Sequence, residues 1–300
     1  MAMNSAAQAL LQSWSPPLGV DVSLCLAAIV YARGWFRLHE ASPKLVSTWR
    51  LAAFIAGIVS VWIAIGSPVE AFDEASLTIH MVQHLLLMAV APPLILLGAP
   101  ALPLLRGLPQ WMARGVAGPF LRWGPVKFLG RLATHPAVCW LAATFALIGW
   151  HLPAVFESAL RSEGLHDLEH AMFFVTGLLF WWPVVQPWPS NARWPRWSIP
   201  LYLFCATLPC DVLSAFLVFC NRVVYSSYLS APRAFGISAL QDQECAAALM
   251  WTCVTIIYLI PAVLVSLEIL SPHNTQLHKE TWPGLEGVTT QPITSKLEVS

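Results

Sequence analysis

Residues 78–100 read T-I-H-M-V-Q-H-L-L-L-M-A-V-A-P-P-L-I-L-L-G-A-P, and this apolar stretch is the most informative part of the chain. It is long enough to cross a bilayer, because a membrane-spanning helix needs about 20 mostly apolar residues. It also holds His80 and His84, which lie about 40° apart on one face of a helix that turns about 100° per residue. Met88 continues the same stripe one turn further along. Since polar side chains are costly inside a bilayer, the histidine pair predicts a functional site within a spanning helix.

The composition of the whole chain is that of an integral membrane protein. Of its 300 residues, 57% are hydrophobic and only 11% are charged, whereas soluble domains have about 25% charged residues. The mean hydropathy is +0.64. The formal net charge is zero, so no basic field indicates a nucleic-acid partner. The first seventeen residues contain no Lys or Arg, so we expect no cleavable signal peptide.

Seven apolar runs of spanning length follow one another, which predicts an all-α bundle of seven transmembrane helices surrounded by membrane lipid. The runs cover residues 19–36, 49–65, 77–97, 136–151, 166–185, 198–219 and 243–267. We therefore expect an outer N-terminal segment at 1–18, a transmembrane domain at 19–270 and a flexible polar tail at 271–300.

The distribution of basic residues predicts how this bundle is oriented. Thirteen of the sixteen Lys and Arg residues fall in the tail or in the loops after the first, third and fifth runs, and three fall on the other side. Because cytoplasmic loops carry an excess of Lys and Arg, this asymmetry puts the N-terminus outside and the C-terminus inside.

That orientation brings five of the nine histidines to one level near the outer face. His80 and His84 lie in the outer third of the third run, His151 ends the fourth, and H-D-L-E-H opens the fifth with His166 and His170. Two such pairs on facing helices can supply four imidazole nitrogens, and neutral imidazole binds copper, zinc, iron and nickel. We therefore predict a metal or haem site formed by these five histidines.

Other side chains at this level could support such a site. The acids there could orient a histidine through its second ring nitrogen, although acids at a helix N-terminus also suit the helix dipole without any ligand role. These acids are Glu157, Asp167, Glu169 and Asp242. Met81 and Met88 could add thioether ligands, which would favour Cu(I), although a methionine in such a run more often serves packing.

Four motifs together resemble the CtaG family of multi-span cytochrome c oxidase assembly proteins, over roughly residues 50–265. They are H-M-V-Q-H and its continuation to residue 100, H-P-A-V-C-W at 135–140, W-H-L-P-A-V-F-E-S-A-L leading to H-D-L-E-H at 150–170, and D-Q-E-C-A-A-A-L-M-W at 242–251. The resemblance implies a seven-helix protein of the bacterial plasma membrane that serves the assembly of haem-copper oxidases, with their subunits as partners, through copper handling. The family's motif residues fall at His80, His84, His151, His166, His170, Asp242 and Gln243.

Several functions are open to a chain of this kind. The leading hypothesis is a copper-binding or copper-delivering assembly factor that is not an enzyme, since the chain shows no nucleophile–base motif. The alternative is a haem-binding electron-transfer protein, but its ligands would be expected in both halves of the membrane, and the inner half offers only His135. A copper transport component would need ligands across the membrane, and a scaffold would use the histidines only for packing. The sequence predicts no oligomeric state.

Overall fold

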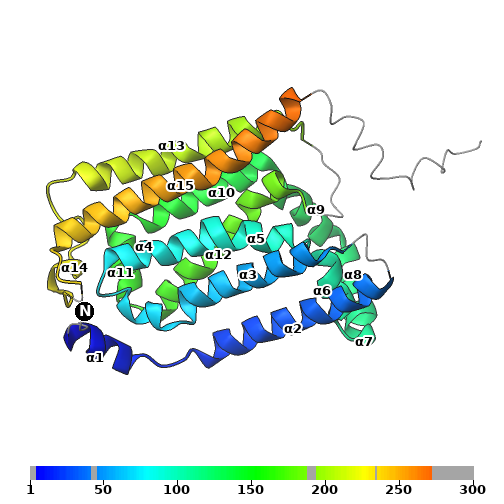
Figure 1. Ribbon diagram of the computed structural model, residues 1–300, viewed down its shortest axis with the longest axis horizontal. Helices are drawn as coiled ribbons and strands as arrows, with labels where there is room; N and C mark the ends of the chain where they lie inside the picture. Colours follow the sequence, from blue (N-terminus) through cyan, green and yellow to red (C-terminus); the bar gives the residue numbers. More distant parts are fainter. Residues whose placement is uncertain (1–4, 42–45, 188–193, 234, 272–300) are drawn as a thin grey trace, which may run out of the picture.

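The computed structural model describes residues 5–41, 46–187, 194–233 and 235–271, and this part of the chain contains helices and no strands. The predicted tail lies outside the described residues from residue 272 onward. The long helices lie side by side, with α11 and α14 at one end of the bundle and α6 to α9 at the other (Figure 1). We call the first of these the histidine end.

The described chain divides into long helices, one interrupted span and short connecting helices. The long helices are α2 (Leu18–Ala41), α3 (Thr48–Ile65), α10 (Pro136–Trp150), α12 (Glu163–Val185), α13 (Ser198–Phe219) and α15 (Ala239–Leu270). The interrupted span consists of α4 (Leu77–Leu85), the π-helical η2 (Leu86–Val90) and α5 (Ala91–Leu97). The short helices are α1 (Ser5–Ser13), η1 (Pro68–Phe72), α6 (Ala101–Gly107), α7 (Gln110–Met112), η3 (Ala113–Ala117), α8 (Gly118–Arg122), α9 (Gly124–Ala133), α11 (Pro153–Leu160) and α14 (Ser227–Ser230).

Six helical segments within the described residues are long and apolar enough to cross a membrane. The predicted fourth run is the shorter helix α10, which reaches spanning length only together with α9, at a bend of 74° between the two. Large apolar side chains such as Phe145 and Val212 are exposed on the outside of the bundle, as expected where helices face lipid. The prediction of an all-α membrane bundle is thus confirmed, with six spans or, counting the bent pair, seven.

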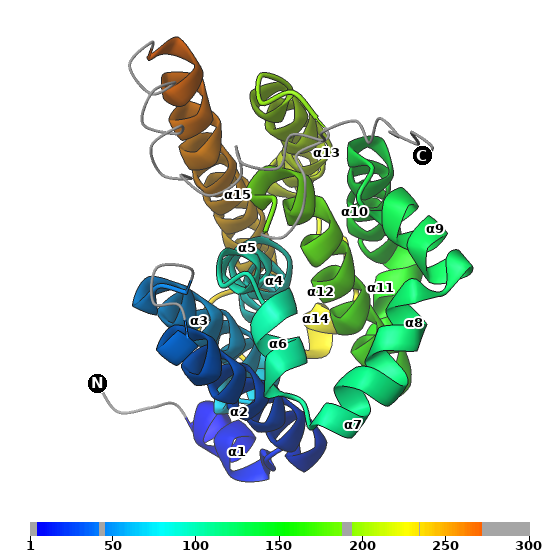
Figure 2. The same ribbon diagram turned by 90° about the vertical axis from the view of Figure 1, so that its right-hand side faces the viewer.

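The interrupted span lies at the centre of the bundle, between α3, α12 and α15 (Figure 2). Its π-helical turn has a local cause. Pro92 has no N–H, so the carbonyl of Met88 lacks its usual helical donor, and the indole N–H of Trp181 on α12 donates to it instead (3.1 Å). Because Gly177 has no side chain, α12 can pack closely against the π-helical turn. A Cβ at this position would lie only 2.9 Å from the backbone of Met88.

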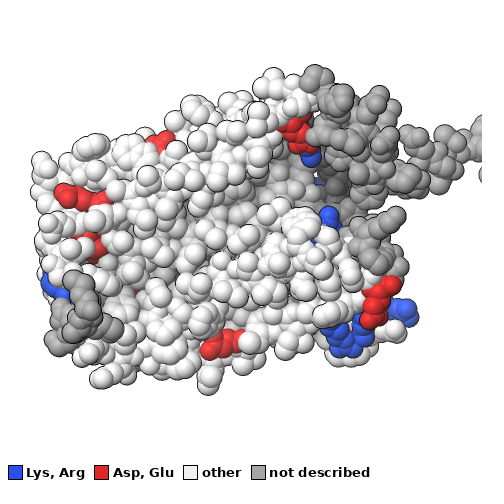
Figure 3. Space-filling model, viewed as in Figure 1, with Lys and Arg blue, Asp and Glu red and all other residues white. Residues whose placement is uncertain are grey.

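Most of the Lys and Arg side chains visible in Figure 3 gather at the end of the bundle that carries α6 and α8. Of the described Lys and Arg residues, only Arg161, Arg222 and Arg233 belong to the segments at the histidine end. Under the positive-inside rule this distribution favours an outward-facing histidine end. The orientation of the chain across a membrane stays a prediction.

Candidate metal centre

Helix α4 carries His80 and His84 into the middle of the bundle. Both side chains are buried, and their ring centroids lie 4.3 Å apart. Gln83, between them in sequence, points elsewhere and donates to the carbonyl of Ala64 on α3 (2.8 Å). The spacing of four residues therefore places the two imidazoles together on the face of α4 that meets α12, as the helical repeat requires.

Helix α12 contributes the second half of the cluster. His166, Glu169 and His170 lie on its inward face, since Glu169 and His170 follow His166 by three and four residues, whereas Asp167 is exposed on the other side. The His166 and His170 rings are 4.3 Å apart, and His170 lies 5.8 Å from His84. The two histidine pairs thus meet across the interface between α4 and α12.

Glu169 is placed between the two histidines of α4. Its Oε1 lies 3.5 Å from His84 Nε2, and its Oε2 lies 3.9 Å from His80 Nε2. One donor atom from each of these three residues falls within 4.8 Å of the others. Tetrahedral ligands at 2.0–2.2 Å from an ion are separated by about 3.3–3.6 Å, so this group needs only small movements to hold one. We call it the inner group.

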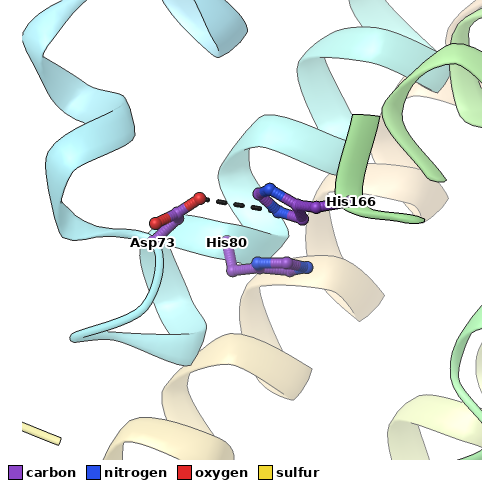
Figure 4. Close-up of side chains that lie close together, drawn as sticks. All are labelled: Asp73, His80 and His166. Atoms are coloured by element: carbon purple, nitrogen blue, oxygen red, sulfur yellow. Dashed lines mark ion pairs between the residues drawn. The ribbon is translucent and has the colours of Figure 1, made fainter. Parts of the chain in front are cut away.

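A second set of donors overlaps with the first. Asp73, just after η1, lies with its Oδ2 3.5 Å from His166 Nε2, and Figure 4 shows both side chains beside His80. One donor atom from each of Asp73, His80 and His166 again falls within 4.8 Å of the others. Burial raises the pKa of the Asp73 carboxyl to about 7. We call these three residues the outer group.

His151 stands at the edge of the cluster, with its ring 6.0 Å from that of His84. Its Nδ1 donates to the carbonyl of Leu147 (2.7 Å), which leaves Nε2 as the nitrogen with a free lone pair. That nitrogen faces the sulfur of Met81 at 3.4 Å. His151 therefore offers an imidazole and a neighbouring thioether, a donor pair that suits Cu(I).

The cluster contains more unsatisfied polar atoms than a protein interior normally tolerates. Buried side-chain nitrogens and oxygens almost always have a hydrogen-bond partner. Here no such partner is found for both ring nitrogens of His80 and His84, for Nε2 of His166 and His170, or for either carboxylate oxygen of Glu169. Each of these imidazoles can present one lone pair, and the carboxylate of Glu169 can present both oxygens. A bound cation would therefore give several of these atoms a partner at once, and the residues fit a metal ion.

The segment around α14 closes the histidine end. Tyr225 donates to the carbonyl of His151 (3.0 Å), and Tyr228 donates to the carbonyl of Asp73 (2.9 Å). Glu157 accepts hydrogen bonds from Ser226 and Ser227. Burial alone would raise the pKa of Glu157, but these hydrogen bonds outweigh it and lower the pKa to about 2. Glu157 thus holds α14 in place and does not orient a histidine.

Two further predicted supporting residues have structural tasks. Asp242 accepts hydrogen bonds from the Leu77 and Thr78 amides (2.6 and 3.1 Å), so it caps the start of α4. Gln243 bridges α15 to the end of α13 by donating to the Leu217 carbonyl (3.1 Å) and accepting from the Val224 amide (2.7 Å). Each residue fixes the helices that surround the cluster. The sequence indicated that they support the histidines, but it did not indicate their hydrogen-bond partners, which are distant in the chain.

The remaining candidates divide between the cluster and its surroundings. Met88 contributes its side chain to a cavity of about 20 Å³ beneath His84 and His151, room for about one water molecule. Asp73 was missed among the sequence candidates, although the acidic loop at 66–76 directly precedes the histidine stretch. His135 lies at the start of α10, against Trp194 and away from the cluster.

Comparison with known proteins agrees with the motifs. The family described as cytochrome c oxidase caa3 assembly factor matches residues 29–271. An uncharacterised protein of Mycobacterium leprae is 22% identical over 87% of this chain and 39% of its own length, and one of Mycobacterium bovis is 24% identical over 84% and 38%. The chain therefore spans about two fifths of the length of these curated relatives.

No solved structure matches the chain. The family match, in contrast, includes every helix that contributes a side chain to the two donor groups. The resemblance inferred from the four motifs is confirmed, and the chain belongs to the family of cytochrome c oxidase caa3 assembly factors.

Proposed function

We propose that this protein assists the assembly of a haem-copper oxidase in the bacterial plasma membrane by holding a copper ion at its histidine end and delivering it to an oxidase subunit. The observation that supports this most is the inner group. Its three residues are buried together, and their facing nitrogen and oxygen atoms have no hydrogen-bond partner. The family description names cytochrome c oxidase as the complex whose assembly is assisted. The distribution of Lys and Arg favours a histidine end that faces outward.

The donor set is compatible with copper in a form that can be released. Imidazole binds both copper oxidation states, the carboxylate of Glu169 suits Cu(II), and the thioether of Met81 beside His151 suits Cu(I). Two histidines and a glutamate also suit zinc, and elemental analysis of the purified protein distinguishes zinc from copper. The role needs no bond-making step, and we assign no catalytic residue.

A haem is a poorer occupant than a single ion. The six histidine ring contacts within the cluster have centroids 4.3–6.2 Å apart. The cavity that reaches His84 and His151 has a volume of only about 20 Å³, whereas pockets for organic ligands usually measure about 300–1,000 Å³. A haem between these rings would therefore require the helices to separate.

Copper transport is the alternative that one observation favours. The sulfur-bearing residues Met81, Met88, Met250 and Cys210 line the small cavity beneath the histidines, and soft sulfur ligands select Cu(I). Uptake into vesicles distinguishes the two roles. Protein reconstituted in liposomes should bind copper without accumulating it in the lumen, and accumulation that depends on Met88 and Cys210 would favour transport.

The metal content of the purified protein tests the proposed function. We expect the parent protein to retain copper after loading, and the His80→Ala/His84→Ala variant to lose it, because two of the three inner ligands are gone. His135→Ala is the matched control, since it removes a histidine that lies at the start of α10, away from the cluster. Elemental analysis and visible spectra should be recorded on samples with equal melting temperatures.

The same variants separate a copper role from a scaffold in the cell. If the protein delivers copper, the double variant should be present in normal amounts yet leave the caa3-type oxidase without its activity, and added copper should restore part of it. Full oxidase activity in that variant would contradict the proposal. So would copper retained without the two histidines, or a Soret band in the parent.

A further inference from the structure

The inner and outer groups differ in how deeply they are buried. In the inner group, the side chains of His80 and Glu169 are 0% exposed and that of His84 is 3% exposed. In the outer group, His166 is 17% exposed and Asp73 is 9% exposed. The outer group therefore lies closer to the surface, while its His166 Nε2 is itself buried and faces Asp73.

His80 belongs to both groups, and it cannot serve both at once in its neutral form. A neutral imidazole has one N–H and one lone pair, so it can bind one cation. Neither ring nitrogen of His80 has a hydrogen-bond partner that would fix the ring or its tautomer. The ring lies 4.3 Å from that of His84 and 5.4 Å from that of His166. His80 is thus placed between the two groups and is free to serve either.

Each group also has its own carboxylate, Glu169 for the inner and Asp73 for the outer. Asp73 is held in position, since its backbone carbonyl accepts from Tyr228 and its Oδ1 accepts from the Glu74 amide. His170 lies between the groups, 4.3 Å from the ring of His166 and 5.8 Å from that of His84. An ion that moves from one group to the other would therefore keep a carboxylate and imidazoles beside it throughout.

From this geometry we propose that one copper ion alternates between the two groups, entering and leaving through Asp73 and His166 and being retained by His84 and Glu169, with His80 as the ligand common to both. This proposal rests on the proposed function and adds the route of exchange. Asp73 and His166 then determine how fast the ion is loaded and released, whereas His84 and Glu169 determine how tightly it is held.

Exchange kinetics test the route. The protein is loaded with Cu(I) under reducing conditions, and the ion is withdrawn with excess bicinchoninate while absorbance is followed. We expect Asp73→Asn and His166→Ala to slow both loading and withdrawal by about tenfold or more, with the equilibrium affinity changed much less. Glu169→Gln and His84→Ala should weaken the affinity and speed withdrawal. Asp167→Asn is the control, since Asp167 is the exposed acid next to His166.

The outcomes separate this route from the proposed function. If the parent retains copper in neither oxidation state, the proposed function itself fails, and if it retains Cu(II) but no Cu(I), only the exchange route is overturned. If the parent binds Cu(I) but neither Asp73→Asn nor His166→Ala alters the rates, or both weaken affinity as much as His84→Ala, only the exchange route is overturned. Two ions bound at once would also overturn it. The two outer variants lie in different segments of the chain, Asp73 in the turn after η1 and His166 on α12. If one variant unfolds, the exchange rates of the other still test the route.

Discussion

Glu169 shows how a single residue indicates the chemistry of the cluster. Its carboxylate is fully buried between His80 and His84, and neither oxygen has a hydrogen-bond partner. Burying an ionised carboxylate without a partner is costly. A bound cation would remove that cost, because it neutralises the charge and occupies the lone pairs.

Replacing that carboxylate tests this explanation at the scale of the residue. Glu169→Gln keeps the shape and removes the charge, so copper affinity should fall by about 10–100-fold or more, as measured by competition with a chelator. The melting temperature of the metal-free variant should not fall, since an amide is easier to bury than a carboxylate. Glu163→Gln, at the exposed start of α12, is the control. Unchanged affinity in Glu169→Gln would remove Glu169 from the site.

Asp242 and Gln243 illustrate the opposite case, in which a motif residue acts through hydrogen bonds that the motif does not reveal. Both belong to the stretch that resembles the family, and both are buried at the level of the histidines. Their hydrogen bonds go to the start of α4, to the last turns of α13 and to the loop after α13. Because those partners are 19 or more residues away, only the folded chain reveals them.

At the scale of elements, the π-helical turn η2 and the close approach of α12 set the distance between the two histidine pairs. Pro92 frees the Met88 carbonyl, Trp181 satisfies it, and Gly177 leaves room for the contact. Small residues commonly permit such close packing of membrane helices. The two faces that carry histidines therefore meet because of residues deeper in the bundle.

Gly177→Ala should separate those helices. Its Cβ would lie 2.9 Å from backbone atoms of Met88, which cannot turn away as a side chain could. We expect a loss of roughly 1–3 kcal/mol in stability, seen as a lower melting temperature in detergent. Gly164→Ala is the matched control on the same helix, because nothing lies within 4 Å of the added carbon. Equal stability of the two variants would show that α12 does not rely on Gly177.

For the whole molecule, the closing of the histidine end depends on α14 being held by Glu157. The pKa of this carboxyl is lowered from its ordinary 4.5 to about 2 in the folded protein. A group with a lowered folded-state pKa stabilises the fold while it is ionised. Its contribution is therefore complete above about pH 4.5 and is lost as the pH falls from there towards about 2.

Glu157→Gln should remove this part of the pH dependence. Between pH 5 and pH 3, the melting temperature of the parent should fall more steeply than that of the variant, which starts lower and changes less. Thermal unfolding in detergent across that range measures both slopes, with Glu163→Gln as an exposed control. Parallel slopes would contradict this account, because they would mean that the hydrogen bonds from Ser226 and Ser227 do not stabilise the ionised form of Glu157.

Much of the whole-molecule organisation could be predicted from the chain. Apolar runs of spanning length gave helices close to the predicted ranges, because a bilayer leaves a hydrophobic segment of that length few other structures. The exception is α10, which is too short alone and pairs with α9 at a sharp bend. Hydropathy could not predict that bend, since it depends on how the two helices pack.

Spanning length and a spacing of four residues are local properties of the chain, so the helices, the family and the shared level of the five histidines could be predicted from the sequence. The tertiary structure, in contrast, fixes which atoms face one another. It brought Asp73 to His166, placed Glu169 between His80 and His84, and turned Glu157, Asp242 and Gln243 to structural tasks. The reason is that such contacts depend on the rotation of each helix and on close packing at residues such as Gly177, which join segments far apart in the chain.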